Sequence, residues 1–202
     1  MKKKLTLVVS LLLVMALSIG GTLAYLTDKT EAVTNTFTIG KVDISLTETG
    51  AANNAKSYHI VPGAVYAKDP TITVTADSED CWLFVKIEDK NNDAGEGAKY
   101  INYDVRSEWK VLDAANQIYY REVKKVDSVK TFYVLTGGTA TDTTTDGTNG
   151  IVTANGTAIT SDYVAALAAG SKTAPQLVFT AYAIQQQGFT TAEAAWTELT
   201  KA

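Results

Sequence analysis

The chain has 202 residues, a formal net charge of −4 and 46% hydrophobic residues, with one cysteine and one histidine. This length suits one domain with a core of its own. With one cysteine, Cys81, and one histidine, His59, the chain can form neither an internal disulfide nor a Cys/His zinc cluster. The acidic balance argues against a nucleic-acid partner, because phosphate binding needs a basic surface. Threonine is abundant and suits solvent-facing strand positions, so the composition favours an extracellular β protein.

The first 24 residues have the pattern of a secretory signal peptide. Three lysines follow the first methionine, an apolar run covers residues 5–19, and the small residues Thr22 and Ala24 precede a cleavage site before Tyr25. The apolar run is shorter than a membrane span of about 20 residues, so we expect cleavage rather than an uncleaved anchor. The mature product would be secreted or held at the cell surface, and it would be more acidic than the whole chain.

Residues 36–47 alternate apolar and polar side chains with period two, which predicts a strand. Apolar residues occupy odd positions up to Ile39 and even positions from Val42 onward. The change of parity falls at Gly40-Lys41, where an inserted bulge residue would produce it. We therefore expect one strand that keeps a single face on the core.

Further strands are predicted from period-two patterns and from β-branched and aromatic residues. They cover residues 71–76, 81–88, 129–135 and 176–185. The last of them places Leu177, Phe179, Ala181 and Ala183 on one face and Val178, Tyr182 and Ile184 on the other. Ser107–Leu112 and Gln117–Arg121 predict a hairpin joined by a four-residue loop.

A polar loop after residue 88 holds the best metal candidate. Asp89, Asn91 and Asp93 have the spacing of the first three ligands of a calcium loop. Ala94 stands where such a loop needs glycine, and Tyr100 stands where its bidentate glutamate belongs. We therefore expect a polar hairpin loop, with calcium as a weak alternative and no cofactor.

The C-terminal third alternates loops, a short strand and two minor helices. Residues 136–150 form a threonine-rich polar segment that predicts an exposed loop, and Asn-Gly pairs flank the short run Ile151–Ala154. Residues 161–169 have helical composition, and Thr190 with Glu193 matches a capping box before a last helix. Short strands without βαβ alternation predict an all-β fold, an antiparallel jelly-roll-like β-sandwich with one or two short helices.

The remaining reactive or aromatic residues have simple structural interpretations. Cys81 begins an apolar strand and is expected to be a small buried hydrophobe, with a nucleophile or a subunit crosslink as alternatives. His59 is expected at the surface or in a hydrogen bond. Seven aromatic residues could line a carbohydrate platform, but at strand spacing core packing is favoured. They are Trp82, Trp109, Tyr119, Tyr120, Phe132, Tyr133 and Trp196.

Two neighbouring motifs carry a family resemblance. Residues 20–28 read Gly-Gly-Thr-Leu-Ala-Tyr-Leu-Thr-Asp, and residues 35–44 read Asn-Thr-Phe-Thr-Ile-Gly-Lys-Val-Asp-Ile. In both, the chain resembles the TasA/camelysin-like proteins of Gram-positive bacteria, which are exported through a SipW-type signal peptidase. Residues 61–63 and 183–188 give weaker support. The threonine-rich segment 136–150 is not expected in the family core.

The resemblance implies a secreted structural protein, a jelly-roll subunit of extracellular fibres in the biofilm matrix. In such fibres the N-terminal segment of each subunit adds a strand to its neighbour. Residues 25–35 would be the N-terminal extension and residues 36–202 the domain. The donor residues expected are Tyr25, Leu26, Thr27, Asp28, Ala32 and Val33. The partners would be further copies of the chain, the signal peptidase and an accessory anchoring protein; an extension without structural role is the alternative.

Two other functions compete with the fibre subunit. One is a monomeric surface module of the adhesin or carbohydrate-binding kind on the same fold. The other is a metallopeptidase, because some members of the broader family carry that label. Zinc hydrolysis needs about three protein ligands and an acid–base group, often arranged as His-Glu-x-x-His, and the sequence has no such motif. We therefore expect no enzyme.

Overall fold

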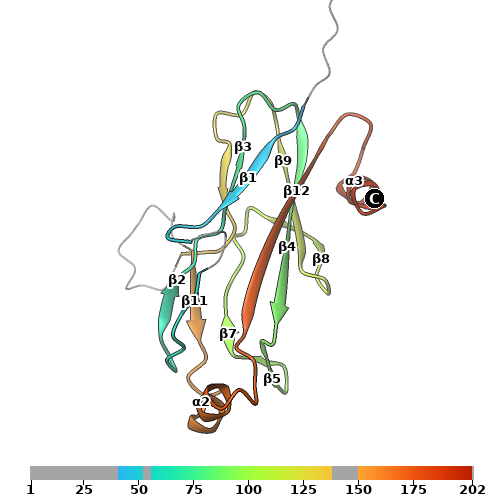
Figure 1. Cartoon of the computed structure of the whole chain (residues 1–202). Helices are drawn as coiled ribbons and strands as arrows, with labels where there is room; N and C mark the ends of the chain where they lie inside the picture. Colours follow the sequence, from blue (N-terminus) through green and yellow to red (C-terminus); the bar gives the residue numbers. More distant parts are fainter. Residues whose placement is uncertain (1–40, 52–55, 138–149, 202) are drawn as a thin grey trace, which may run out of the picture. The chain divides into compact units, whose positions relative to one another are not determined.

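The computed structural model describes residues 41–51, 56–137 and 150–201 (Figure 1). These residues form an antiparallel β-sandwich with two short helices, which confirms the predicted fold class. Within them, no helix combines the length and the apolar character that a membrane span requires. The signal peptide and the expected donor segment lie outside the described residues.

The first layer of the sandwich is a four-stranded sheet. Its order is β12 (Gln176–Gln185), β4 (Cys81–Lys90), β9 (Ile118–Val123) and β8 (Lys110–Asp113). β12 and β4 pair over ten residues, from Gln185 opposite Cys81 to Gln176 opposite Lys90. β8 and β9 form the predicted hairpin around a turn at residues 114–117.

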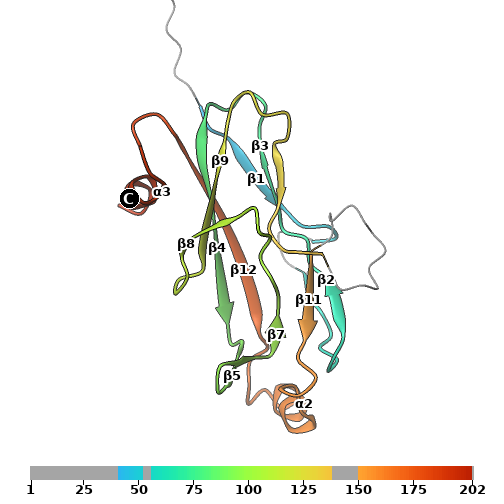
Figure 2. The same ribbon diagram turned by 180° about the vertical axis from the view of Figure 1, so that it is seen from behind.

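The second layer consists of two three-stranded sheets, seen from both sides in Figures 1 and 2. One has the order β1 (Ile44–Thr47), β3 (Thr71–Val74), β10 (Thr131–Tyr133), and the other has the order β2 (Val65–Ala67), β11 (Ile151–Ala154), β7 (Ile101–Asn102). Strand pairing breaks between β2 and β3 at Pro70, which has no N–H to donate. A small hairpin, β5 (Asp93–Gly95) and β6 (Ala98–Lys99), precedes β7. The chain changes layer between β3 and β4, β4 and β7, β7 and β8, β9 and β10, and β11 and β12, as expected for a jelly-roll-like sandwich.

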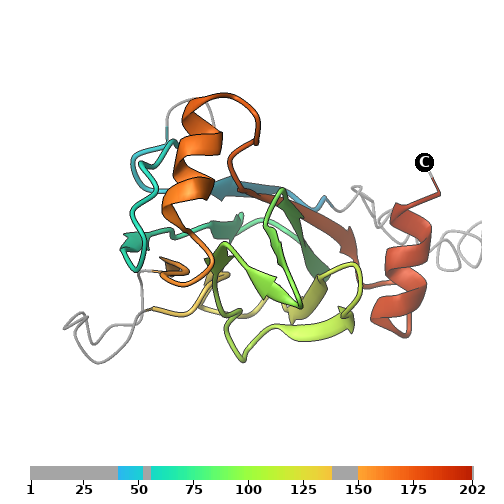
Figure 3. The same cartoon turned by 90° about the horizontal axis from the view of Figure 1, so that it is seen from below.

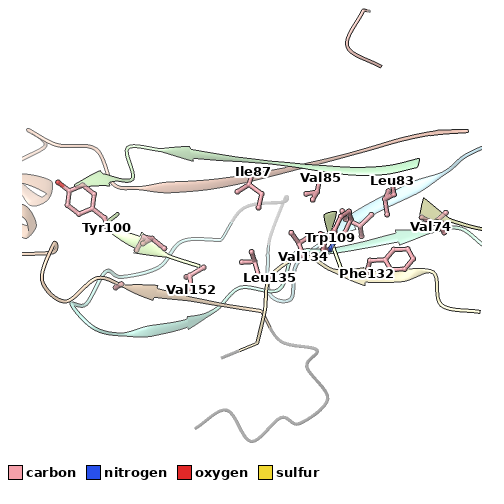
Figure 4. Packing of buried hydrophobic residues seen from close by; sticks show 14 of the residues in the cluster. Val74, Leu83, Val85, Ile87, Tyr100, Trp109, Phe132, Val134, Leu135 and Val152 are labelled. Atoms are coloured by element: carbon pink, nitrogen blue, oxygen red, sulfur yellow. The ribbon is translucent and has the colours of Figure 1, made fainter. Parts of the chain in front are cut away.

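The main core lies between the layers, where side chains of both inner faces meet (Figure 4). Leu83, Val85 and Ile87 alternate along β4 and are at most 1% exposed. Opposite them lie Leu135 and Val152 of the second layer. This alternation follows from the two-residue period of a strand, which sends every second side chain to the same face.

A second hydrophobic cluster covers the outer face of the first layer. Trp82 and Phe84 of β4 point outward there, beneath helix α3 (Ala192–Leu199). The Trp196 ring centre lies 5.2 Å from that of Phe84 and 5.2 Å from that of Tyr182. The predicted inner face of β12 packs on the main core, and on the outer face Tyr182 and Ile184 pack under α3, whereas Val178 lies opposite Glu88 outside that cluster.

Several predicted strand ends differ from the observed ones. The strand expected at 71–76 ends at Val74, and the strand expected at 129–135 is reduced to Thr131–Tyr133. In the strand expected at 36–47, β1 begins only at Ile44, and residues 36–40 lie outside the described part. β4 instead runs two residues further than predicted, to Lys90, because β12 pairs with it over its full length.

The last helix begins one residue later than the capping pattern predicts. Thr191, rather than Thr190, caps α3, and its hydroxyl accepts a hydrogen bond from the Ala194 N–H at 3.2 Å. Glu193 then lies in the first turn, where its negative charge interacts favourably with the positive end of the helix dipole. It does not take the position of a capping-box glutamate. With this start Ala192 and Ala195 both face the sheet and are buried. The other helix, α2 (Ser161–Ala168), lies at one end of the sandwich (Figure 1).

Gly150, the residue before β11, has no room for a side chain. A Cβ there would lie 2.3 Å from the Lys68 carbonyl oxygen and 2.9 Å from the Leu135 Cβ. We expect Gly150→Ala to lower the free energy of unfolding by about 1–3 kcal/mol, because the backbone must shift to admit the methyl group. Urea denaturation measures the change. Gly156→Ala is the control, since the nearest atom lies 3.5 Å away; equal effects of both variants would contradict the prediction.

Candidate functional site

β1 and β12 are edge strands of different layers that lie side by side (Figures 1 and 3). β1 pairs only with β3, and β12 pairs only with β4, among the residues that the structure describes. No described strand pairs with the second edge of either strand, so the backbone N–H and C=O groups along it are open to a further strand. Such groups are a template to which a further strand can pair.

The inward-facing side chains of these two edge strands are only half-buried. They pack against the main core, and they are Ile44, Leu46, Leu177, Phe179, Ala181 and Ala183, with Val42 just before β1. The other side of the sandwich, which holds the edges β10, β7 and β8, is different. There Phe132 is 6%, Ile101 is 8% and Trp109 is 4% exposed. The core is thus closed on one side and partly uncovered on the side of β1 and β12, which we call the open edge.

An arginine helps to close the opposite side. The guanidinium carbon of Arg121 lies 3.9 Å from the ring centre of Phe132 and 5.4 Å from that of Trp109. Burial lowers the pKa of Arg121, and no carboxylate pairs with it within 41–51, 56–137 and 150–201. Its side chain therefore stabilises this side by covering aromatic rings rather than by an ion pair.

A charged pair borders the open edge. Lys68 Nζ lies 2.6 Å from Glu48 Oε2, and both side chains are largely buried. The Tyr58 hydroxyl donates to Glu48 Oε1 at 2.9 Å, and burial together with this carboxylate raises the pKa of Tyr58. Lys68 Nζ also lies 5.2 Å from the ring centre of Phe179, a residue of the open edge. Near Phe179 the open edge therefore has polar side chains, Glu48, Lys68 and Tyr58, next to its apolar core residues.

The three calcium candidates each have their own surroundings. The Asp89 carboxylate accepts hydrogen bonds from Lys99 and from the Tyr103 hydroxyl. Asn91 is exposed, with a positive φ of 55° in the turn after β4. The Asp93 Oδ1 accepts a hydrogen bond from the Gly95 N–H at 2.8 Å. Protein donors therefore engage both carboxylates, as in an ordinary polar loop.

Asn92, which sequence reasoning passed over, is the buried polar residue of that loop. Its side chain is 2% exposed and forms two hydrogen bonds with the backbone of Ile101. The Asn92 Nδ2 donates to the Ile101 carbonyl at 2.9 Å, and the Ile101 N–H donates to Asn92 Oδ1 at 2.7 Å. No sequence signal distinguishes Asn92 from its polar neighbours, because its burial depends on β7 folding back over it.

Cys81 and His59 lie in opposite environments. Cys81 is fully buried at the start of β4, as predicted, and burial raises the pKa of its thiol to about 11. The thiol is therefore protonated at neutral pH and enclosed by the core. His59 is exposed in the segment before β2. These two side chains cannot meet at one metal ion.

The seven aromatic residues do not form one platform. Trp109, Tyr119 and Phe132 belong to the main core, whereas Trp82, Tyr120 and Trp196 belong to the cluster under α3. Tyr133 is half-buried beside the Trp109 indole, which donates to its carbonyl. Core packing therefore explains their spacing.

The family model of the camelysin metallo-endopeptidases matches residues 1–134. The chain belongs to this family. The resemblance to TasA/camelysin-like proteins is thereby confirmed, over about two thirds of the chain. The match includes β1 to β10 and ends before β11, α2, β12 and α3. No curated protein and no solved structure matches the chain.

The name camelysin metallo-endopeptidase implies a bound metal. The side chains of this chain can therefore be compared with the ligands that such a metal needs. In the part of the chain that the structure describes, no three His, Cys, Asp or Glu side chains are grouped as metal ligands would be. The single cysteine is enclosed in the core, and the single histidine is exposed. The described residues therefore do not fit the zinc site of a peptidase, which needs about three converging ligands.

Proposed function

We propose that this camelysin-family protein is a secreted structural subunit of extracellular fibres, and that it assembles by strand addition. The open edge carries the proposal. Along β1 and β12 apolar core side chains are half-buried beside strand edges that no other described strand pairs with, while the core side chains on the opposite side of the sandwich are covered. A strand laid along this edge would cover the apolar side chains and pair with the backbone.

The expected donor fits β12 in length. β12 has ten residues, and the segment Tyr25–Thr34, which would follow signal-peptide removal, also has ten. The donor would come from a second copy, so that each subunit both gives and accepts a strand and the contact repeats along a fibre. Before export the signal peptide would precede this segment directly, so cleavage would release the donor.

A structural role agrees better with the residues than a catalytic one. The family name points to a peptidase, but the sequence has a single histidine, and the described carboxylates are engaged by lysine, hydroxyl or backbone donors or lie apart. An adhesin-like monomer would not need an uncovered core edge. The partners would be further copies of the chain, the signal peptidase and an accessory anchoring protein, and the site of action would be the extracellular matrix or the cell surface.

The test compares residues 25–202 with residues 36–202. The shorter chain keeps both hydrophobic clusters, which residues 42–199 supply. We expect fibres from the longer chain and monomers from the shorter one, by light scattering and electron microscopy. We also expect a synthetic peptide of residues 25–34 to bind the shorter chain and to stop the longer chain from assembling. Monomers from both chains would overturn the proposal.

A pair of neighbouring substitutions on β12 locates the acceptor. Ala181 faces the core at the open edge, whereas Thr180 faces outward opposite Lys86. Ala181→Asp should abolish peptide binding and assembly, and Thr180→Asp should leave both intact, with circular dichroism confirming that each variant folds. Cleavage of azocasein by the mature protein, lost with a chelator, would instead support the peptidase alternative.

A further inference from the structure

The loop between β9 and β10, residues 124–130, displays two exposed valines. Val126 is 91% exposed and Val129 is 62% exposed. Among the large apolar residues of the described chain these two are the most exposed. Single exposed apolar residues are ordinary, but two of them on one short loop offer apolar surface that a partner can cover.

This loop is held in place by polar contacts, although its valines touch no core. The backbone N–H of Lys125 donates to Asp80 Oδ1 at 2.7 Å, and Lys125 Nζ donates to Glu79 Oε1 at 2.7 Å. Asp127 Oδ2 accepts a hydrogen bond from the Lys124 N–H at 2.7 Å. The backbone hydrogen bond from Lys125 favours the ionised form of Asp80 and lowers its pKa. A loop fixed in this way presents its valines at little entropic cost.

The loop lies where the described chain begins. The Glu79 N–H donates to the Lys41 carbonyl at 3.0 Å, and the Glu79 carboxylate binds Lys125 in the loop. Figure 2 shows the β9–β10 loop and the start of β1 at the same end of the sandwich. Residues 35–40 connect the expected donor to Lys41, and six residues span at most about 20 Å. A donor strand docked on a neighbour therefore brings that neighbour close to this end.

We propose that Val126 and Val129 form a second contact with the neighbouring copy that accepts the donor strand. The inference rests on the proposed function, since strand donation is what brings the neighbour to this end. The short connection limits how far the two copies can separate, and the rigid loop supplies an apolar surface at that point. The strand would hold the copies together, and the loop would fix their relative orientation.

The test uses the full mature chain, residues 25–202, with Val126→Ser and Val129→Ser combined. Both side chains are exposed, so the fold should remain intact, which thermal unfolding checks. We expect the concentration needed for fibre growth to rise at least tenfold. Val111→Ser is the matched control, because Val111 is 58% exposed on β8, away from the loop, and should assemble normally.

Binding of the donor peptide separates this inference from the proposed function. In residues 36–202 the double variant should bind the peptide of residues 25–34 as tightly as the native sequence does. Unchanged fibre growth by the double variant would overturn the loop contact and leave strand donation standing. Failure of the native chain to bind the peptide would overturn strand donation, and the loop contact with it.

Discussion

Phe84→Ala is expected to lower the free energy of unfolding by about 3–5 kcal/mol, the range for truncating a fully buried aromatic residue. Phe84 is 0% exposed and lies between the sheet and α3. Its ring centre is 5.2 Å from that of Trp196 and 6.4 Å from that of Tyr120. The variant leaves a cavity in the smaller cluster, and α3, an eight-residue helix, has little stability without this contact.

Urea denaturation followed by tryptophan fluorescence measures the loss. Trp196→Ala serves as the comparison, because it removes the helix side of the same contact and leaves the sheet side intact. We expect a smaller loss for Trp196→Ala, since Trp196 is only half-buried. A loss below about 1 kcal/mol for Phe84→Ala would show that the cluster under α3 does not contribute to the stability of the sandwich.

Asn92→Ala is expected to lower the free energy of unfolding by about 2–6 kcal/mol. The amide of Asn92 satisfies both backbone groups of Ile101, and each would be left buried without a partner at about 1–3 kcal/mol. The substitution removes few apolar contacts, so the loss comes from unpaired polar groups rather than from a cavity. The backbone of β7 should open near Ile101.

Hydrogen exchange and urea denaturation test this prediction together. The Ile101 amide should exchange faster in the variant, and the free energy of unfolding should fall. Asn116→Ala is the control: Asn116 is exposed and bonds only to Asp113 across a surface turn, so its loss should be small. Equal losses for both variants would contradict the role assigned to Asn92.

Much of the strand pattern could be predicted from the sequence because it depends on local periodicity. The alternation in residues 176–185 assigned both faces of β12, and the structure has an apolar cluster on each. Short or broken strands could not be predicted in the same way. β2, β7 and the hairpin β5–β6 have two or three residues each, too few for a period to appear. Their pairing depends on partners far away in the chain.

One half of the candidate site, the donor segment, could be predicted from the sequence, and the other half, the acceptor edge, could not. The donor segment follows from the cleavage motif at Ala24 and Tyr25, which is local in sequence and stays a prediction. The acceptor could not be located from the sequence, because an edge strand and a central strand can have the same pattern. Only the sheet order makes β12 an edge, and only the burial of its inner face shows an incomplete core.

The sequence by itself determined the family and the all-β class, because these depend on local motifs and composition. Its single cysteine and single histidine also excluded a Cys/His zinc cluster. The tertiary structure decided which side of the sandwich is closed and which is open. Phe132 of β10 and Ile44 of β1 are both apolar residues of edge strands, yet Phe132 is buried under Arg121 and Ile44 stays half-exposed on the side of β12. Burial depends on which strands become neighbours, and neighbours in a sandwich are set by long-range pairing that no local pattern encodes.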